Sequence, residues 1–559
     1  MYVDAYKTDK DIIKVIERVN GSKVFREYKV KYVAYYEDPD GQYRTIWDVP
    51  CKKIEAKSSY DFKGALNTYQ DKNIHESDIN PIFRCLEDNY LDCESPDLNV
   101  ALFDIETNFD PDRGFADPWE PFAPITAISV YRKWKGDLLT FVMKPDLPED
   151  HEYFLTFNEA EEITSEFENC ILCDSEELLL ELFLESISDV DLISGWNSSG
   201  FDIPYTVNRV KEVLGKEHMK RFNAFPNVFP KIRKYMKFKK ENRTYDLIGR
   251  VHLDYLELYQ KHAPAEMSSY RLDYIGEQEV GEHKVQYDGT LDMLYKKDFK
   301  KFIEYNRQDV MLLNKIDDKL KYIGLANQIA HTNTVLLQTT MGSVALVEQA
   351  IINETHKLGK IVPNRKKKYE EDMFDEEEYG FDINKGPAVG AHVADPKVGI
   401  HKEIGCCDIN SLYPSAIRSL NMSPETLIGQ IRNDRTNKFI EDRVKTGASV
   451  PEAWNKVFCL IEFDMVRNKT DDILILDFID GSEVELTAKE VYEMIFKEGS
   501  NIILSANGTL FTKNKKGIIP DLLEKWYSQR KTMQKKEKIF TNLINDGIMV
   551  PDDLLSQLV

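Results

Sequence analysis

The sequence predicts a multidomain chain built from α/β and α+β domains. Three observations support this prediction. The chain has 559 residues, 42% of them hydrophobic, which is more than one domain of typical size uses. Strand-like and helix-like segments alternate between residues 99 and 324. A strand-and-turn pattern follows from about 388 to 511, and a long helix is expected from Pro520 onward.

The first 98 residues are predicted to form a mixed domain that is rich in strands. Residues 30–36 are a run of β-favouring residues, and Asp-Pro-Asp-Gly at 38–41 is typical of a turn. Residues 325–375 have a partly helical pattern and are expected to complete this domain. A highly charged segment at 365–378 then predicts a linker.

An α/β domain is predicted for residues 99–324. Its expected strands are 100–103, 125–131 and 190–196, and its expected helices are 176–187 and 298–323. The first strand ends directly before Asp104, and the third leads into a polar turn. Strands that alternate with helices in this way favour an α/β domain.

Residues 376–516 are expected to form a further domain, and residues 517–559 begin a helical one. Within the former, residues 433–500 have weak periodicity and alternating charge, so they are assigned only as an insertion. In the latter, apolar residues from Leu522 to Phe540 recur at near-helical spacing.

Composition limits the classes of function. The net charge of −23 argues against a general nucleic-acid coat, but local basic runs such as Lys231–Lys234 and Arg530–Lys531 are compatible with binding a phosphate backbone. The sequence has no run of about 18 apolar residues, which a membrane span would need, and the N-terminus lacks a signal-peptide pattern. We therefore expect a cytoplasmic protein without a membrane partner.

The eight cysteines are scattered along the chain. Cys170 and Cys173 form one C-x-x-C pair, without a second Cys or His pair at zinc spacing nearby. Zinc binding is one interpretation, and reduced structural thiols are the simpler one.

Four acids and a tyrosine, in three segments, form a pattern typical of two-metal chemistry. Asp104 and Glu106 lie on one side of a predicted strand end, a pairing common in a chain with 96 acids. Asp202 lies in a segment otherwise suited to a buried wall, and Tyr305 and Asp309 share one helix face. Such a set suits hydrolysis of a phosphodiester, in which the tyrosine orients the attacking water.

These segments resemble a known enzyme family. Asp-Ile-Glu at 104–106, N-x-x-x-F-D at 197–202 and Y-x-x-x-D at 305–309 resemble the three motifs of the 3′→5′ proofreading exonuclease of family B DNA polymerases. The apolar-leaning run Ile404–Cys407 predicts a strand that ends at Asp408. Residues 408–415 resemble the D-x-x-S-L-Y-P-S segment of the same family. The sequence segments 269–275, 287–289 and 423–426 are similar to segments of the T4-type bacteriophage subgroup of this family.

The resemblance covers essentially the whole chain except 433–500, and it implies an architecture. Residues 1–98 would be the N-terminal domain, completed by about 325–375, and 99–324 an RNase H-like exonuclease domain. Residues 376–516 would be a partial palm with the insertion, and 517–559 the first part of the fingers.

The resemblance also implies roles for the exonuclease residues. Asp104, Glu106, Asp202 and Asp309 would be metal ligands, and Tyr305 would lie at the attacking water. The implied cofactor is Mg²⁺ or Mn²⁺, with two ions in each active site. The implied substrates are primer–template DNA and a single-stranded DNA 3′ end.

A polymerase half-site is implied in the same way. Asp408 would be a metal-bridging palm aspartate, and the backbone of Ser411, Leu412 and Tyr413 would hold the triphosphate of a dNTP. The ring of Tyr413 would exclude a 2′-hydroxyl, although a core aromatic is the alternative interpretation of this residue.

The fingers contribute a further implied contact. Arg530 would bind the γ-phosphate, because its planar donors suit a phosphate. The family usually has a lysine four residues later, where this chain has Gln534 beside Lys535, which leaves the second phosphate contact open. Val389–Ala391 resembles the small-residue loop between palm and exonuclease.

The sequence lacks the second palm carboxylate that an Asp-Thr-Asp segment supplies in this family. One carboxylate does not anchor two ions, so synthesis by this chain alone is not expected. The hypothesis is an N-terminal subunit or fragment of a phage replicative polymerase. A C-terminal polypeptide would supply the remaining fingers, palm and thumb, and a sliding clamp would bind through that partner. The alternatives are a stand-alone 3′→5′ exonuclease with a non-catalytic palm remnant, and a non-catalytic nucleic-acid-binding module.

Overall fold

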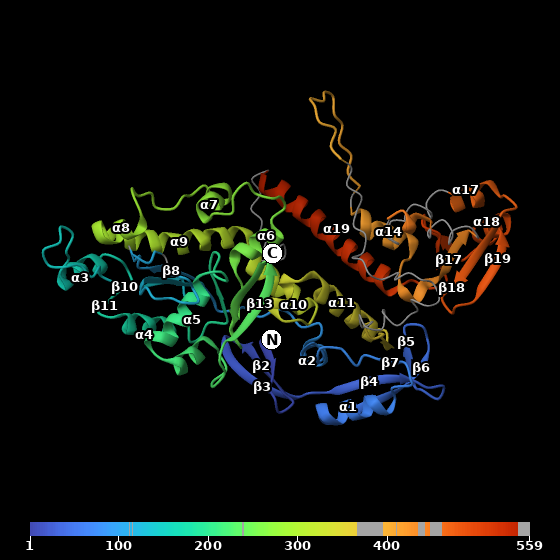
Figure 1. The fold of residues 1–559 in the computed structure, drawn as a ribbon, viewed down its shortest axis with the longest axis horizontal. Helices are drawn as coiled ribbons and strands as arrows, with labels where there is room; N and C mark the ends of the chain where they lie inside the picture. The colour runs from blue at the N-terminus through green and yellow to red at the C-terminus, as the bar shows by residue number, and fades with distance from the viewer. Residues whose placement is uncertain are drawn as a thin grey trace. The chain divides into compact units, whose positions relative to one another are not determined.

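The computed structural model describes residues 1–110, 112–114, 116–237, 240–365, 395–409, 411–433, 442–447 and 461–545. The chain divides into two compact units (Figure 1). The first comprises Met1–Ala34, Lys53–Asp71 and Ile79–Asn353; the second comprises Tyr35–Lys52, Lys72–Asp78 and Glu354–Val559. The loop expected at 389–391 and the charged segment 366–378 lie outside the described residues.

The first unit contains a six-stranded mixed sheet of order β11-β10-β9-β8-β12-β15. Its strands are β8 (Val100–Thr107), β9 (Ile125–Arg132), β10 (Asp137–Met143), β11 (Cys170–Cys173), β12 (Leu192–Ser194) and β15 (Val251–His252). β8 pairs with β9 antiparallel and with β12 parallel, so β8 lies inside the sheet. The strands expected at 100–103, 125–131 and 190–196 are confirmed as β8, β9 and β12.

Two smaller sheets belong to the same unit. β1 (Tyr2–Lys7), β2 (Ile12–Val19) and β3 (Ser22–Lys29) form an antiparallel meander, and β13 (Lys231–Lys237) pairs with β14 (Lys240–Asp246) as a hairpin.

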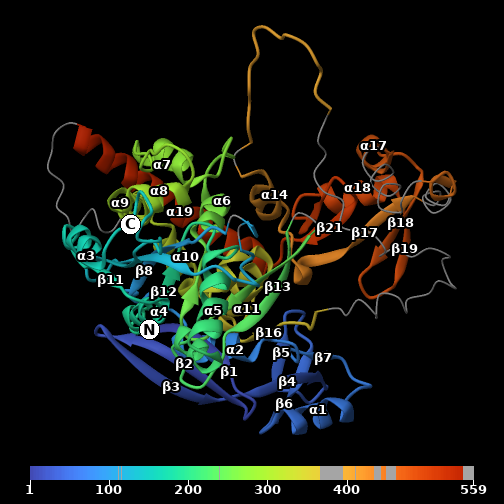
Figure 2. The same ribbon diagram turned by 60° about the vertical axis from the view of Figure 1, so that its left-hand side comes forward.

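Helices cover both faces of the six-stranded sheet. Along residues 1–357 the described helices are α1 (Ser59–Thr68), α2 (Pro81–Tyr90), α3 (Phe157–Ser165), α4 (Glu176–Ser186), α5 (Asp202–Val213), α6 (Tyr255–His262), α7 (Leu272–Val280), α8 (Leu291–Lys297), α9 (Phe299–Leu320), α10 (Tyr322–Thr332) and α11 (Ser343–Lys357), with 3₁₀ turns at Lys216–Phe222 and Leu337–Met341. In both views α9 lies along one face of the sheet, and α4 and α5 lie along the other (Figure 1 and Figure 2).

Alternation along β8 decides which side chains meet which helices. Phe103 and its i±2 neighbours pack into a core with α4 and α5, whereas Leu102 packs into a core with Val310 and Leu313 of α9. Since successive strand residues point to opposite faces, Asp104 and Glu106 are directed toward the α9 side.

Helix α9 starts and stops for identifiable reasons. The Asp298 side chain accepts a hydrogen bond from the N–H of Lys301 and caps the N-terminus. Lys321 adopts a left-handed conformation with φ 54° and ends the helix before α10 begins. The helical stretch expected at 298–323 is therefore confirmed, except for this break.

Two further sheets have five strands each, in the order β16-β5-β6-β4-β7 and β19-β18-β17-β21-β20, and the latter lies in the second unit. The strands of the former are β4 (Tyr32–Glu37), β5 (Tyr43–Thr45), β6 (Pro50–Ala56), β7 (Ile74–His75) and β16 (Lys360–Ile361). Those of the latter are β17 (Leu427–Asn433), β18 (Ile473–Phe478), β19 (Glu483–Thr487), β20 (Ile502–Leu504) and β21 (Thr509–Thr512). The described helices between residues 395 and 545 are α14 (Leu412–Leu420), α17 (Ile461–Asn468), α18 (Ala488–Phe496) and α19 (Ile518–Asn545), with a 3₁₀ turn at Pro424–Thr426.

The segment assigned only as an insertion contributes to a core. Leu474 and Leu476 of β18 pack with Val491 of α18 and with Ile431 and Leu510 of the neighbouring strands. Residues of 433–500 that the structure describes therefore belong to the sheet that β17 and β21 complete.

Asn421 connects the end of α14 to the start of α19. Its Nδ2 donates to the carbonyl oxygens of Thr512 (2.7 Å) and Lys515 (2.8 Å), and its Oδ1 accepts from Gly517 N (2.9 Å). A Cβ at Gly517 would lie 2.6 Å from Ser423 Cβ, so only glycine fits this approach.

One expected element is absent. The run Ile404–Cys407 was predicted to end a strand, but residues 402–409 form no strand and are exposed, with Ile404 74% exposed. A strand needs a hydrogen-bonded neighbour to be stable, and no strand in the described ranges pairs with this run.

Candidate functional site

Three predicted acids meet between β8 and α9. One carboxylate oxygen from each of Asp104, Glu106 and Asp309 lies within 4.8 Å of the others. Asp309 is 3% exposed, and no hydrogen-bond donor among the described residues meets its Oδ1. A buried carboxylate oxygen without a donor suits a cation ligand, so these residues fit divalent metal ions.

Asp202 reaches the same place from a third element. It is the first residue of α5, is 5% exposed, and its Oδ1 accepts from the N–H of Ile105 at 3.3 Å. Because β12 runs parallel to β8, the turn after β12 returns the chain beside the end of β8. The structure therefore brings all four predicted acids into one neighbourhood.

A carboxylate that the sequence analysis missed holds this turn. Asp254 accepts hydrogen bonds from the N–H groups of Asn197 (3.0 Å) and Ser199 (2.9 Å) and also caps α6 through Leu256 N (3.0 Å). Gly195 allows the close approach, because a Cβ there would lie 2.7 Å from the carbonyl oxygen of Phe103.

Lys284 is a second residue that sequence reasoning missed. Its Nζ donates to Asp309 Oδ2 at 2.5 Å and to the Tyr305 hydroxyl at 3.1 Å. It lies in an irregular segment between α7 and α8, where no periodic pattern or predicted motif draws attention to it. Its ammonium supplies positive charge to the acidic cluster.

Burial and mutual repulsion shift the carboxyl groups toward the protonated form. Burial raises the pKa of Asp104 well above its ordinary value, and the charges of Glu106 and Asp202 add to this. Burial also raises the pKa of Glu106 and brings that of Asp202 to about 7. For Asp309, burial raises the pKa while Lys284 opposes the rise. A divalent cation would remove this repulsion.

Tyr305 stands one helical turn before Asp309 on α9, as predicted. Burial raises its pKa, so the phenol keeps its proton at neutral pH. Its ring meets that of Tyr287 edge-on, with centroids 5.4 Å apart. A fixed, protonated phenol can orient a water molecule by hydrogen bonding.

The predicted polymerase residues lie in the second unit. Asp408 is exposed, and none of the acid clusters found among the described residues includes it. Ser411 has φ 53° and precedes α14, while Leu412 and Tyr413 are 51% and 65% exposed. Tyr413 is therefore not a core aromatic. Arg530, Gln534 and Lys535 are exposed on α19.

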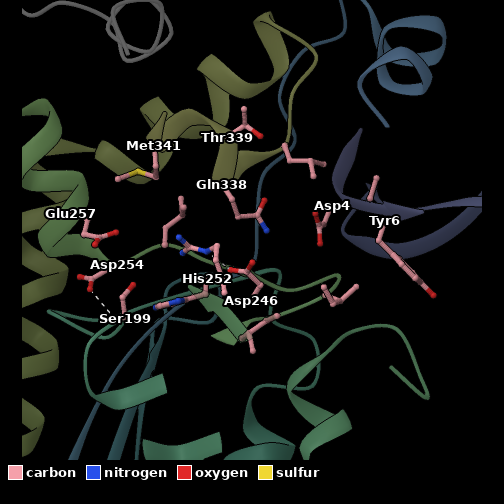
Figure 3. Close-up of a pocket in the computed structure, with 16 residues that line it drawn as sticks. Asp4, Tyr6, Ser199, Asp246, His252, Asp254, Glu257, Gln338, Thr339 and Met341 are labelled. Carbon is pink, nitrogen blue, oxygen red and sulfur yellow. Dashed lines mark hydrogen bonds and ion pairs between the residues drawn. The ribbon is translucent and has the colours of Figure 1, made fainter. Parts of the chain in front are cut away.

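The first unit also contains a cavity of about 370 Å³ (Figure 3). Asp4, Asp246, Asp254, Glu257, His252 and Gln338 are among its lining residues. Burial raises the pKa of Asp4 to about 7, although Asp4 accepts a hydrogen bond from Gly249 N at 2.7 Å. None of the predicted site residues lines this cavity.

The C-x-x-C pair is not part of the metal-ligand cluster found among the described residues. Burial raises the pKa of Cys170 to about 11 and that of Cys173 to about 12, so both thiols are protonated at neutral pH. No helix in the described ranges is long and apolar enough to cross a membrane.

The fold and the cluster together define an α/β domain with a buried carboxylate cluster that is compatible with divalent ions. A model of the family B DNA polymerase exonuclease domain matches residues 45–275, and a model of DNA polymerase family B matches residues 333–547. The chain belongs to the family B DNA polymerases.

Relatives agree with this assignment. The DNA-directed DNA polymerase of Escherichia phage RB69 is 28% identical over 433 residues, covering 74% of this chain and 46% of the relative. That of Enterobacteria phage T4 is 28% identical over 345 residues, covering 62% and 31%. The DNA polymerase delta catalytic subunit of Plasmodium falciparum is 26% identical over 488 residues, covering 79% and 40%. The chain thus spans less than half the length of these relatives.

Proposed function

We propose that this chain removes nucleotides from the 3′ end of DNA as the proofreading part of a phage replicative DNA polymerase. The observation that carries the proposal is the convergence of Asp104, Glu106 and Asp309, with Asp202 beside them, at one end of the sheet. The matched exonuclease family model and the phage relatives support it.

Each residue has a chemical task in this proposal. Asp104, Glu106, Asp202 and Asp309 hold two Mg²⁺ or Mn²⁺ ions, which when bound activate water and stabilise the leaving oxygen. Tyr305 orients the attacking water through its hydroxyl. Lys284 supplies a positive charge beside Asp309. This charge would stabilise the negative charge that develops on the phosphate in the transition state.

The second part of the proposal concerns synthesis. Asp408, with the backbone of Ser411, Leu412 and Tyr413 and the guanidinium of Arg530, forms half of a dNTP site. The carboxylate cluster found in the described part of the chain does not include Asp408, and the sequence has no Asp-Thr-Asp segment to supply a second palm carboxylate. We therefore propose that a C-terminal polypeptide supplies the remaining fingers, palm and thumb and binds a sliding clamp. The working environment would be the cytoplasm of a bacterial host.

The proposed domains follow the same reasoning. Residues 99–324 are the exonuclease domain, and 1–98 with about 325–375 are the N-terminal domain. Residues 376–516 are a partial palm, and 517–559 the first part of the fingers.

One observation favours a second candidate, a stand-alone 3′→5′ exonuclease. The exonuclease residues lie wholly within the first unit, whereas the segment that bears Asp408 is exposed and forms no strand. A palm remnant without catalytic function would have this appearance.

The test uses a 5′-labelled primer–template with Mg²⁺, with and without dNTPs. The chain alone is expected to shorten the primer in both cases. Asp104→Ala should abolish shortening, and Asp408→Ala should leave it unchanged. Primer extension by the chain alone would contradict the half-site argument, and no shortening would indicate a binding module instead.

A second experiment separates the two enzyme candidates. A family B polypeptide carrying the second palm aspartate is added to the chain. Extension that appears on mixing and is lost with Asp408→Ala supports the subunit proposal. Continued shortening without extension supports the stand-alone exonuclease.

A further inference from the structure

Asn306 contacts a metal ligand from inside the protein. It follows Tyr305 on α9 and is 0% exposed. Its Nδ2 donates to Asp104 Oδ2 at 3.0 Å and lies 3.4 Å from the main-chain oxygen of Asp104. Reversing the amide would place Oδ1 against two oxygens, so the contacts determine the orientation of this side chain.

We propose that Asn306 is a positioning residue for the metal ligand Asp104. The inference rests on the proposed two-metal function and extends it. A carboxylate on a short side chain rotates about two bonds unless something fixes it. The hydrogen bond from Asn306 holds Oδ2 of Asp104 in place. Because the carboxylate is planar, Oδ1 is then oriented as well, and it remains available to bind an ion. Asn306 itself touches neither ion nor substrate.

The same helix offers a matched control. Asn314 is 5% exposed, and its Nδ2 donates to Asp318 Oδ2 at 2.9 Å. In both residues Oδ1 is buried without a hydrogen-bond partner. The two asparagines therefore share residue type, helix and burial, and each donates from Nδ2 to an aspartate. The aspartate bound by Asn314 lies four residues further along the same helix and outside the carboxylate cluster, whereas the one bound by Asn306 lies on β8 and belongs to the cluster.

The experiment measures Mn²⁺ binding to the full chain by calorimetry, without DNA. Asn306→Leu keeps the volume and removes the donor, and it is expected to weaken Mn²⁺ binding about tenfold. Asn314→Leu is expected to bind Mn²⁺ as the unsubstituted chain does. Unchanged binding by Asn306→Leu, or equal weakening in both variants, overturns the proposal.

A second variant covers the case in which Asn306→Leu does not fold. Asn306→Ala leaves room for a water molecule to donate in place of the amide, so a smaller loss of Mn²⁺ affinity is expected. It is judged by the same two criteria, with folding checked by circular dichroism. The Mn²⁺ concentration that gives half-maximal exonuclease rate should shift in parallel.

Failure of this inference is distinct from failure of the proposed function. If Asp104→Ala binds Mn²⁺ as tightly as the unsubstituted chain, the cluster is not the metal site. If Asp104→Ala loses binding while Asn306→Leu retains it, only the positioning role is wrong.

Discussion

The ammonium of Lys284 lies 2.5 Å from a carboxylate oxygen of Asp309. The same ammonium donates a second hydrogen bond, to the hydroxyl of Tyr305 at 3.1 Å. Although burial alone would lower the pKa of Lys284, the charge of Asp309 raises it, so the lysine stays charged. A loop cation thus partly balances the acids before any metal ion binds.

Replacing Lys284 with Met should destabilise the metal-free chain by about 3 kcal/mol, because a buried carboxylate loses its partner. Mg²⁺ should reduce this loss, since divalent ions supply the missing charge. Urea unfolding in EDTA and in Mg²⁺ measures both values. Lys315→Met breaks the exposed pair with Glu282 and should cost less than about 1 kcal/mol. Equal losses for Lys284→Met in both conditions would contradict the balancing role.

Replacing Tyr305 with Phe should lower the exonuclease rate about 10- to 100-fold, because the water loses the hydroxyl that orients it. Mn²⁺ binding should be unchanged, since all four carboxylates remain. Single-turnover digestion of a single-stranded oligonucleotide measures the rate. Tyr295→Phe removes another buried hydroxyl, which donates to the carbonyl oxygen of Met143 at 2.9 Å, and it should leave the rate intact. A rate unaffected by Tyr305→Phe would remove the phenol from the mechanism.

Metal binding should strengthen as pH rises. Protons compete with metal at carboxylates whose pKa is raised, such as Asp202 at about 7. Mn²⁺ affinity is therefore expected to increase with pH, by up to about tenfold per pH unit for each proton released. Titrations at pH 6, 7 and 8 in buffers of different ionisation enthalpy count the protons released. Proton-free binding with constant affinity would be inconsistent with the raised pKa values.

Asp4 makes folding pH-dependent in the opposite sense to a salt-bridged acid. Its pKa rises from 3.8 to about 7 on burial, so the folded chain retains a proton that the unfolded chain releases between these values. Its contribution to stability is greatest below pH 4 and declines toward pH 7, by at most about 4 kcal/mol. Asp4→Asn should remove this decline. Denaturant unfolding at pH 5 and pH 8 compares the two chains; a constant difference between them would show that Asp4 ionises freely.

The sequence predicted those parts of the site whose spacing reflects regular structure. Asp104 and Glu106 alternate on a strand, and Tyr305 and Asp309 share a helix face, so their convergence follows from periodicities of two and 3.6. Lys284 has no such periodicity, because an irregular segment places it. Asp254 was missed because an acid before a helix usually serves only as a helix cap. Its hydrogen bonds to the turn before Asp202 join residues that are far apart in the sequence, so no local pattern indicates them.

The errors have physical causes too. The run Ile404–Cys407 has strand-like composition, yet composition does not supply a neighbouring strand. Residues 433–500 include short strands such as β19, whose five residues carry too little periodic signal to detect. The motif alone suggested a role for Tyr413, and its exposure now argues against core packing as the reason for an aromatic there.

The hydrogen bonds of Asn421 to Thr512, Lys515 and Gly517 hold the start of α19 and so affect the direction of its axis. Arg530 lies about 18 Å along the helix from Ile518, at 1.5 Å per residue. An error of about 10° in the direction of α19 at its base would displace the backbone at Arg530 by about 3 Å, a whole hydrogen-bond length. If Arg530 has the role proposed for it, the direction of its guanidinium is therefore set at the N-terminal end of the helix, by the side-chain amide of Asn421.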